Sequence, residues 1–373
     1  MYGYTRTRHS FNIVRNQEIF HNQIIHYMNH FMKIFGTVLM IFFLPANITM
    51  GQITLRKVTD ELVFKSPPFA QCHASSIAEV TPEKFIVAAF GGSVEGNKDV
   101  CIWLSASESG RWSEPAKTAD GIINDTLRYP CWNPVLFKTK EGKLFLFYKV
   151  GPSPRSWWGM VRTSTDDGSI WTSPERLPEG ILGPIKNKPV QLPDGTILSA
   201  SSVETSQSWK VHMEKSLDSG KTWKFIPVDS ETKFNVIQPT ILIHPDNKLQ
   251  ILCRSKSNAI VQAFSVDNGT TWGLLTKTEL PNPNSGIDAV TLKDGWFLLV
   301  YNPTIQGRND RARLNVAVSK DGIKWKDALI LENESKGEFS YPAVIQPADG
   351  RIHITYTYNR VNIKHVVLEE KIL

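Results

Sequence analysis

The sequence predicts an all-β fold, a six-bladed β-propeller that is closed by an N-terminal strand. Three observations support this prediction: four boxes of the form Ser-x-Asp-x-Gly-x-x-Trp, a repeat of strand-length apolar segments, and the absence of helical periodicity. The box residues Trp171, Trp223, Trp272 and Trp325 are 52, 49 and 53 residues apart. A spacing near 50 residues indicates one supersecondary unit that is used repeatedly.

Each of these boxes, which we call Asp boxes, has the composition of a hairpin turn closed by its own side chains. Ser and Asp hydrogen-bond to the turn backbone, Gly takes the positive-φ position, and Trp covers the turn. The boxes are Ser164–Trp171, Ser216–Trp223, Ser265–Trp272, the shorter Ser319–Trp325, and a degenerate copy at Ser105–Trp112. We therefore expect Asp-box hairpins that stabilise the fold and carry no catalytic group.

Apolar strands joined by acidic turns, such as Asp194-Gly195, account for the rest of each repeat. The predicted first strands are Cys72–Val80, Pro130–Lys138, Lys186–Leu192, Val236–His244, Gly286–Leu292 and Ser340–Pro347. The predicted second strands are Lys84–Phe90, Lys143–Lys149, Thr196–Ser202, Lys248–Arg254, Trp296–Tyr301 and Arg351–Thr357. A third strand leads into each box and a fourth follows its Trp, as at Trp171–Leu177 and Trp272–Thr276.

The last repeat lacks a strand, because the chain ends after a third strand near Lys364–Leu368. The segment Ile53–Phe64 has no place in any other repeat, so we expect it to form the outer strand of the sixth blade and close the ring. No linker composition interrupts residues 52–373, which are predicted to form a single domain.

The first 51 residues resemble a leader rather than part of the fold. Met32-Lys33 and the apolar run Gly36–Ala46 are typical of a signal peptide at about residues 32–51, with cleavage near Gly51-Gln52. The run is too short to span a bilayer, so we expect no stable membrane anchor. The prediction is an exported protein, periplasmic or secreted.

Composition and cysteine usage exclude several classes of function. The net charge of +6 falls to +3 without residues 1–51, and no Lys/Arg run is present, so we expect no nucleic-acid partner. Cys72, Cys101, Cys131 and Cys253 show no metal-ligand spacing and are predicted to be buried free thiols. We expect no metal or organic cofactor, and the sequence leaves the oligomeric state open.

In the predicted propeller, polar and aromatic residues concentrate on the face opposite the Asp boxes, where the central channel opens and ligands are expected. The first strands begin there with His73, Trp132, Asn133, Lys186, Lys188, Gln238, Asp288 and Tyr341. The loops on this face add Asp99, Trp157, Trp158, Arg254, Arg311 and Arg313.

The boxes, the six repeats and these rim residues together resemble the sialidase (neuraminidase) superfamily over residues 53–373. This resemblance implies a Tyr nucleophile at Tyr341 and carboxylate-binding arginines at Arg254 and Arg311, with Arg313 as the alternative to Arg311. It also implies an acid/base Asp near Asp99.

Two groups of the superfamily's site are missing. Gln71–Ala74, which includes His73, stands where the resemblance implies a first arginine, and Val236 stands where it implies the Glu that activates the Tyr nucleophile. Because two arginines remain and these two groups are absent, we expect a pocket that still binds an acidic sugar but catalyses a different reaction. We expect a lyase or dehydratase that acts by β-elimination on uronic-acid-containing oligosaccharides. The chain is also similar to propeller enzymes of marine bacteria that degrade ulvan.

In this hypothesis Arg254 and Arg311 hold the uronate carboxylate, while His73 or His212 shares the acid and base roles with Tyr341. Residues expected to contact the acidic oligosaccharide are Asp99, Trp132, Asn133, Trp157, Trp158, Lys186, Lys188, Gln238, Asp288 and Arg313. The alternatives are an exo-sialidase-type hydrolase and a non-catalytic propeller that binds acidic glycans. A carboxylate within hydrogen-bond reach of Tyr341 would favour the hydrolase.

Overall fold

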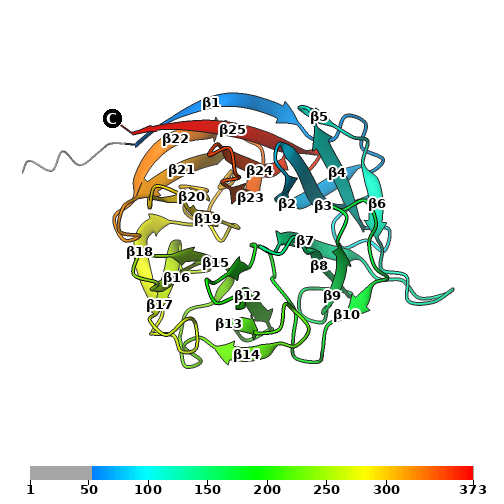
Figure 1. Cartoon of the computed structure of the whole chain (residues 1–373), viewed down its shortest axis with the longest axis horizontal. Coiled ribbons are helices and arrows are strands. Elements are labelled where there is room, and N and C mark those ends of the chain that lie inside the picture. The colour runs from blue at the N-terminus through cyan, green and yellow to red at the C-terminus, as the bar shows by residue number, and fades with distance from the viewer. Residues whose placement is uncertain (1–52, 373) are drawn as a thin grey trace, which may run out of the picture. The chain divides into compact units, whose positions relative to one another are not determined.

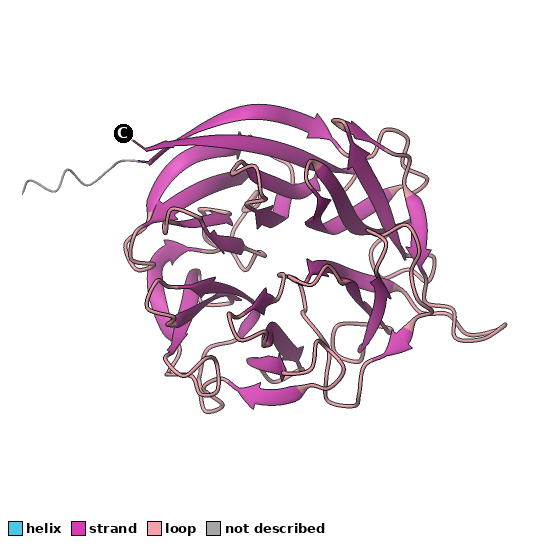
Figure 2. Ribbon diagram, viewed as in Figure 1, coloured by secondary structure: helices cyan, strands magenta, loops and turns pink. Residues whose placement is uncertain are grey.

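The computed structural model describes residues 53–372, and the predicted signal peptide lies outside these residues. No helix occurs in this range, and the strands form six sheets arranged as blades around a central axis (Figures 1 and 2). The prediction of an all-β, six-bladed propeller is confirmed. None of the residues in this range forms a helix long and apolar enough to cross a membrane.

The blades follow one another along the chain, with the first strand of each next to the central axis. The first three are β2 (Gln71–Thr81), β3 (Lys84–Gly92), β4 (Cys101–Glu108), β5 (Arg111–Trp112) and β6 (Ala116–Ala119); β7 (Cys131–Lys138), β8 (Leu144–Val150), β9 (Trp158–Ser164) and β10 (Glu175–Arg176); and β11 (Val190–Gln191), β12 (Ile197–Glu204), β13 (Trp209–Ser216) and β14 (Lys224–Pro227).

The next two blades are β15 (Val236–Ile243), β16 (Leu249–Ser255), β17 (Ala259–Ser265) and β18 (Thr276–Pro281); and β19 (Asp288–Thr291), β20 (Phe297–Tyr301), β21 (Arg313–Ser319) and β22 (Lys326–Asn333). The sixth is β23 (Phe339–Ile345), β24 (Ile352–Tyr358), β25 (Asn362–Ile372) and β1 (Ile53–Leu62). The strand β1 pairs antiparallel with β25, from Ile53 opposite Ile372 to Leu62 opposite Lys364. The predicted closure is therefore confirmed.

Three predicted strands are shorter or displaced in the structure. The first strand of blade three is reduced to β11, because the preceding segment Lys186–Lys188 bends into the channel instead of pairing. The predicted fourth strands Trp171–Leu177 and Trp272–Thr276 begin later, as β10 and β18. The residues around each Trp belong to the Asp-box turn, so strand pairing begins only a few residues after the Trp.

The Asp boxes form the hairpin locks that their composition predicts. The Gly168 N–H donates to Ser164 Oγ at 2.9 Å, and the Ile170 N–H donates to Asp166 Oδ1 at 2.9 Å. In the next box, hydrogen bonds from Thr222 lower the pKa of Asp218 to about 2. These bonds satisfy the turn backbone locally.

Each box glycine also packs against the second strand of the preceding blade. A Cβ added at Gly168 would lie 2.4 Å from Ile86 Cδ1 in β3, and one at Gly220 would lie 2.9 Å from Phe145 in β8. The same relation joins Gly269 to Leu198 of β12 at 2.7 Å. The boxes therefore also fix the packing between neighbouring blades.

We predict that Gly168→Ala destabilises the protein more than Gly142→Ala does. Both glycines have positive φ, 82° and 92°, but a Cβ at Gly142 meets nothing within 4 Å. Both substitutions cost about 1 kcal/mol of backbone strain, and overpacking against the buried Ile86 adds about 1–3 kcal/mol to the first. Urea unfolding measures the difference, and equal losses would contradict the interblade contact.

A buried cluster of polar side chains lies where the ring closes. His353 Nδ1 of β24 lies 3.0 Å from His365 Nε2 of β25, and His365 Nδ1 lies 3.0 Å from Glu61 Oε1 of β1. Trp112 of blade one donates to the same Glu61 oxygen at 3.0 Å. Burial, with the neighbouring His365, lowers the pKa of His353 to about 3. The cluster therefore binds the closing strand with a neutral His353.

This cluster predicts that the protein loses stability in acid. The unfolded chain protonates His353 near pH 6.5 while the folded protein does not, so stability falls as pH decreases from about 6.5 towards 3. The contribution of this side chain is up to about 1.4 kcal/mol per pH unit. Unfolding free energies measured across this range should show a shallower dependence for His353→Gln, and an unchanged slope would contradict the assignment.

Candidate active site

Four first strands carry a strained residue near the channel. Ala74, Asn133, Gln238 and Tyr341 have φ of 57°, 38°, 55° and 52°. Each lies within a β-bulge of its strand pair, and the last three precede a proline. Bulges redirect side chains, and positive φ in non-glycine residues costs about 1–2 kcal/mol. Strain of this kind is concentrated at functional sites.

Tyr341 lies at the centre of the polar cluster. Its hydroxyl accepts a hydrogen bond from Arg254 Nη1 at 2.6 Å and lies 3.4 Å from Gln238 Nε2. Arg254 is itself oriented by Asn284, whose Oδ1 accepts from Arg254 Nε at 2.8 Å. Among residues 53–372, no carboxylate hydrogen-bonds to the Tyr341 hydroxyl.

The side chain of Gln238, an uncharged amide, therefore lies beside the Tyr341 hydroxyl. Val236, at the position where the superfamily resemblance implies the Glu that activates the Tyr nucleophile, is fully buried in the core, whereas Gln238 lies within the β-bulge between Ile237 and Thr240 and its Nε2 is 3.4 Å from the Tyr341 hydroxyl. Because a bulge redirects side chains, the residues of β15 that reach Tyr341 cannot be read from residue number alone.

His73 contacts Tyr341 but is almost inaccessible. The two ring centroids are 4.2 Å apart, and His73 Nδ1 lies 2.9 Å from Thr357 Oγ1. The side chain is 2% exposed. Burial and the nearby charge of Arg360 hold the pKa of His73 well below its ordinary value, so the ring is neutral at neutral pH. This arrangement orients the Tyr341 ring.

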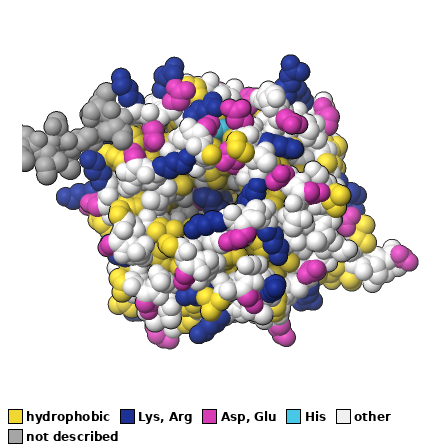
Figure 3. Space-filling view, viewed as in Figure 1, with side chains coloured by type: hydrophobic (Ala, Val, Ile, Leu, Met, Phe, Trp, Pro, Cys, Tyr) yellow, Lys and Arg dark blue, Asp and Glu magenta, His cyan; other side chains and the backbone are white. Residues whose placement is uncertain are grey.

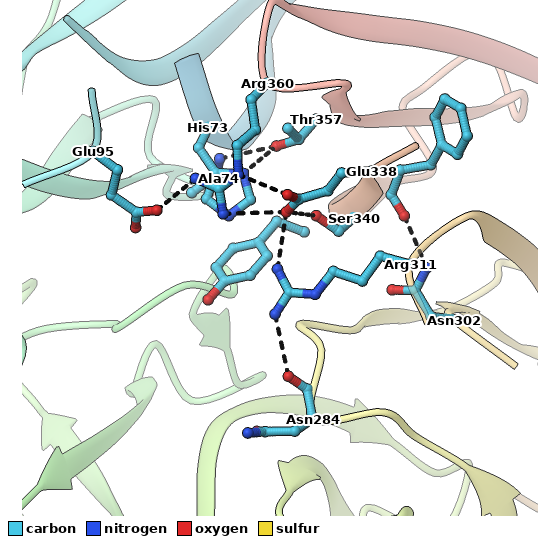
Figure 4. A network of polar contacts seen from close by, with 12 residues as sticks. His73, Ala74, Glu95, Asn284, Asn302, Arg311, Glu338, Ser340, Thr357 and Arg360 are labelled. Carbon is cyan, nitrogen blue, oxygen red and sulfur yellow. Dashed lines mark hydrogen bonds and ion pairs between the residues drawn. The ribbon is translucent and has the colours of Figure 1, made fainter. Parts of the chain in front are cut away.

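A second cluster adjoins the first and is centred on Glu338 (Figure 4). Glu338 accepts from Arg311 Nη1 at 2.9 Å, from Arg360 Nε at 2.7 Å and from Ser340 Oγ at 2.9 Å. Arg360 also pairs with Glu95 from the β3–β4 loop. Although burial raises the pKa of Glu338, the hydrogen bond from Arg360 and the charges around it lower this pKa to about 2.

Sequence reasoning did not identify Glu338 and Arg360. The repeat could have indicated Arg360. Blades four, five and six each carry an arginine near the connection between the second and third strands: Arg254, Arg311 and Arg360. Three guanidinium groups therefore gather beside Tyr341, and those of Arg254 and Arg311 each lie 5.7 Å from its ring centroid. On the face shown in Figure 3, the molecule is hollowed near its centre and Lys and Arg side chains surround the hollow.

Lys186 and Lys188, predicted to bind substrate, instead join blades across the channel. Lys186 Nζ donates to Asn187 Oδ1 at 2.8 Å, to Ile287 O at 3.0 Å and to Pro342 O. Lys188 pairs with Asp288 at 2.9 Å. Burial lowers the pKa of Lys186 to about 7. These amines and the Asp288 carboxylate are already bonded to protein groups, so the structure assigns them to channel packing.

Two further predicted residues lie away from Tyr341. His212 is 2% exposed in β13, and its Nε2 lies 3.0 Å from Glu214 Oε1, so the structure does not bring its ring to Tyr341. The His212 ring stacks on Phe225 of the outer strand β14, with ring centroids 4.3 Å apart, so it belongs to the packing of blade three. Asp99 accepts from Ser93 N at 2.7 Å and Ser93 Oγ at 2.9 Å, which closes the β3–β4 loop.

The three tryptophans expected to stack on sugars are mainly packing residues. Trp132 and Trp157 are 7% and 9% exposed and pack together with Ile185. Trp158 packs edge-on against Tyr129, with ring centroids 5.7 Å apart. Trp209, which sequence reasoning placed on the rim without a role, has a half-buried ring 5.7 Å from the Arg254 guanidinium.

The remaining predicted residues divide between the channel and the rim. Asn133 is buried at its strained channel position, while Arg313 is exposed and lines a separate cavity. Cys72, Cys101, Cys131 and Cys253 are buried free thiols, as the sequence predicts. Within residues 53–372, no group of three or more His, Cys, Asp or Glu is placed to hold a metal ion.

This fold and this arginine-rich, tyrosine-centred site define a sialidase-like propeller. The family model of the BNR repeat-like domain matches residues 83–354, and the chain belongs to this family. An anhydrosialidase of the leech Macrobdella decora is 21% identical over 249 residues, which is 57% of this chain and 32% of that protein. The match thus spans about a third of the curated relative.

Solved structures show the same architecture at low sequence identity. A protein of unknown function from Dyadobacter fermentans has a TM-score of 0.70 at 18% identity and covers 85% of this chain and 100% of its own. The NanB sialidase of Streptococcus pneumoniae gives 0.66 at 12%, over 83% of this chain and 70% of its own. A leech intramolecular trans-sialidase gives 0.65 at 14%, over 84% and 70%.

We predict that Glu338→Gln destabilises the protein by about 2–3 kcal/mol at neutral pH. The wild-type carboxyl has a folded pKa of about 2 against an ordinary 4.5, so its stabilisation is complete above pH 4.5 and is lost towards pH 2. The substitution also leaves Arg311 and Arg360 without their shared counter-ion. Urea unfolding at pH 7 and pH 3 measures this difference.

The exposed Glu114 offers a matched control for that experiment. Glu114→Gln removes the same charge from the surface, where ion pairs contribute little, and should change stability by less than about 0.5 kcal/mol. A loss for Glu338→Gln that stays constant between pH 7 and pH 3 would contradict the charge-based account.

Proposed function

We propose that this protein is a carbon–oxygen lyase that acts by β-elimination on uronic-acid-containing oligosaccharides, such as ulvan fragments. The observation that carries the proposal is the Tyr341 hydroxyl, which accepts a 2.6 Å hydrogen bond from Arg254 and has the amide of Gln238 beside it. A guanidinium donor stabilises negative charge on the phenolic oxygen, which suits proton transfer. A Tyr nucleophile would instead require a carboxylate to activate it.

The arginines account for the acidic sugar. The guanidinium groups of Arg254 and Arg311 each lie 5.7 Å from the Tyr341 ring centroid. Guanidinium groups bind carboxylates with two parallel hydrogen bonds. Neutralising the uronate carboxylate stabilises the charge that develops at C5 when its proton leaves. The relatives named for sialidase activity act on another acidic sugar, which also supports an acidic glycan as the substrate.

The proposed reaction needs one proton transfer in each direction. Tyr341, acting as the phenolate that Arg254 stabilises, takes the C5 proton and becomes the phenol; the electron pair forms the C4–C5 double bond, and the C4–O bond breaks with its electrons on the leaving oxygen. A proton returned to that oxygen completes the elimination, and Tyr341 itself becomes able to supply it once protonated. His73 is a positioning residue in this scheme, because its buried ring contacts Tyr341 and leaves the hydroxyl free.

An exo-sialidase-type hydrolase is the second candidate. The observation that favours it is the convergence of Tyr341, Arg254 and Arg311, which the superfamily resemblance implies. The relatives with sialidase names point in the same direction. The uncharged Gln238 next to Tyr341 favours elimination over this alternative. In either case we propose an exported protein whose catalytic domain spans residues 52–373.

We predict that Tyr341→Phe abolishes activity while the fold remains intact. The substitution deletes only a hydroxyl, so kcat/KM should fall by about 10³-fold or more with little change in unfolding free energy. The assay incubates the full chain with uronate oligosaccharides and records ultraviolet absorbance and product mass. A 4,5-unsaturated uronate formed by the wild type supports elimination.

Tyr129→Phe is the matched control, since Tyr129 is half-buried against Trp158 outside the Tyr341 cluster. It should retain wild-type turnover. Cleavage with a gain of one water per bond and no new chromophore would establish the hydrolase instead. Binding without any turnover of uronate or sialic-acid substrates would establish a glycan-binding propeller.

A further inference from the structure

A second cavity of about 660 Å³ lies beside the candidate active site, on the outer side of the β20–β21 loop. This volume is within the range of small-ligand sites. Its walls are that loop, Pro281 at the end of β18, and Glu334 and Ser335 after β22. The loop is therefore shared, because Arg311 at its end faces Glu338 while residues 303–310 line the cavity.

The cavity contains an unusual balance of charged groups. Arg308, Arg313, Asp310 and Glu334 all line it, and within residues 53–372 none of their side chains forms an ion pair. Elsewhere in the site the acidic residues are paired, as Glu338 is with Arg311. Two guanidinium groups and two carboxylates thus remain available to a ligand.

The cavity is also held in shape without these four side chains. Asn309 Nδ2 donates to Ser335 O at 2.7 Å, which joins the loop to the opposite wall. The Gln306 N–H donates to Asn258 Oδ1 at 3.0 Å, which ties the loop to blade four. A preformed cavity of this kind loses little conformational entropy when a ligand binds.

We propose that this cavity binds a neutral sugar unit of the same oligosaccharide whose acidic unit occupies the arginine-rich site. A sugar hydroxyl both donates and accepts, so it is matched by carboxylates and guanidinium groups on facing walls. Pro281, Pro303 and Ile305 offer apolar surface to the C–H face of the ring. The equal numbers of positive and negative side chains do not favour an anion, in contrast to the three arginines around Tyr341.

The geometry supports one chain of sugars across both sites. Arg311, in the turn that ends the β20–β21 loop, bonds to Glu338 of the active-site cluster, while Arg313, two residues on at the start of β21, lines the cavity. Arg311 Nη2 also donates to Asn284 O at 3.3 Å, three residues beyond Pro281. This inference rests on the proposed acidic-oligosaccharide substrate and adds a requirement for its neighbouring sugar.

The test measures binding separately from turnover, with Tyr341→Phe as the background so that ligands stay intact. Calorimetric titrations use a desulfated ulvan tetrasaccharide, in which neutral rhamnose alternates with uronate, and free glucuronate. Adding Arg313→Ala and Glu334→Gln should weaken tetrasaccharide binding by about 10-fold, because two charged hydrogen-bond partners are lost. The loss for glucuronate should be less than 2-fold. The exposed Lys336 supplies the control Lys336→Ala, which should leave both affinities unchanged.

Equal losses for both ligands, or no loss for the tetrasaccharide, would overturn the cavity assignment. Thermal unfolding of each variant checks that the fold is retained, as expected for exposed side chains. Failure of the proposed function has a different signature, since the wild type would then form no unsaturated product. Binding of the tetrasaccharide that weakens in the cavity variants without such a product would support the cavity and reject the lyase.

Discussion

Pairing of β1 with β25 is the interaction on which the rest of the structure depends. The candidate site takes His73 from blade one, Arg254 from blade four, Arg311 from blade five and Tyr341 from blade six, so it exists only in a closed ring. Closure joins residues more than 300 positions apart, and Glu61, His353 and His365 reinforce it from within. A propeller that opened there would separate the two halves of the site before any blade unfolded.

The interior of the ring shows how buried charge is accommodated when it is not used for catalysis. Lys186, Lys188 and Asp288 bond to one another's blades across the channel, where each group has protein partners. Their cost of desolvation is offset by these bonds, as burial of charge requires. Tyr341, Arg254 and Arg311 also have protein partners, but these partners hold the guanidinium groups around the Tyr341 hydroxyl instead of joining blades through the channel. Gln238 and Tyr341 both have positive φ, and this backbone conformation accompanies the approach of their side chains to within 3.4 Å.

Two neighbouring sites share one loop in this arrangement. Arg311 belongs to the charged cluster around Glu338, while Arg308 and Arg313 line the adjacent cavity. The charge balance differs between them, with an excess of arginine around Tyr341 and an equal number of acids and bases in the cavity. A heteropolymer of acidic and neutral sugars is matched by such a pair of sites, whereas a single acidic monosaccharide would use only the first.

The sequence by itself determined the propeller, its six blades and its closing strand, because Asp boxes and strand-length apolar segments are local patterns that repeat. It also placed Tyr341 at the start of a first strand, and Arg254 and Arg311 in loops on the same face, because these positions recur in every repeat. Tertiary structure alone decided the partners. A β-bulge placed Gln238 beside Tyr341, His212 lies buried against Glu214 within β13, and the β24–β25 loop brought Arg360 to Glu338 at the start of blade six. Register shifts and contacts between distant loops leave no periodic trace in a chain, so only the folded ring shows them.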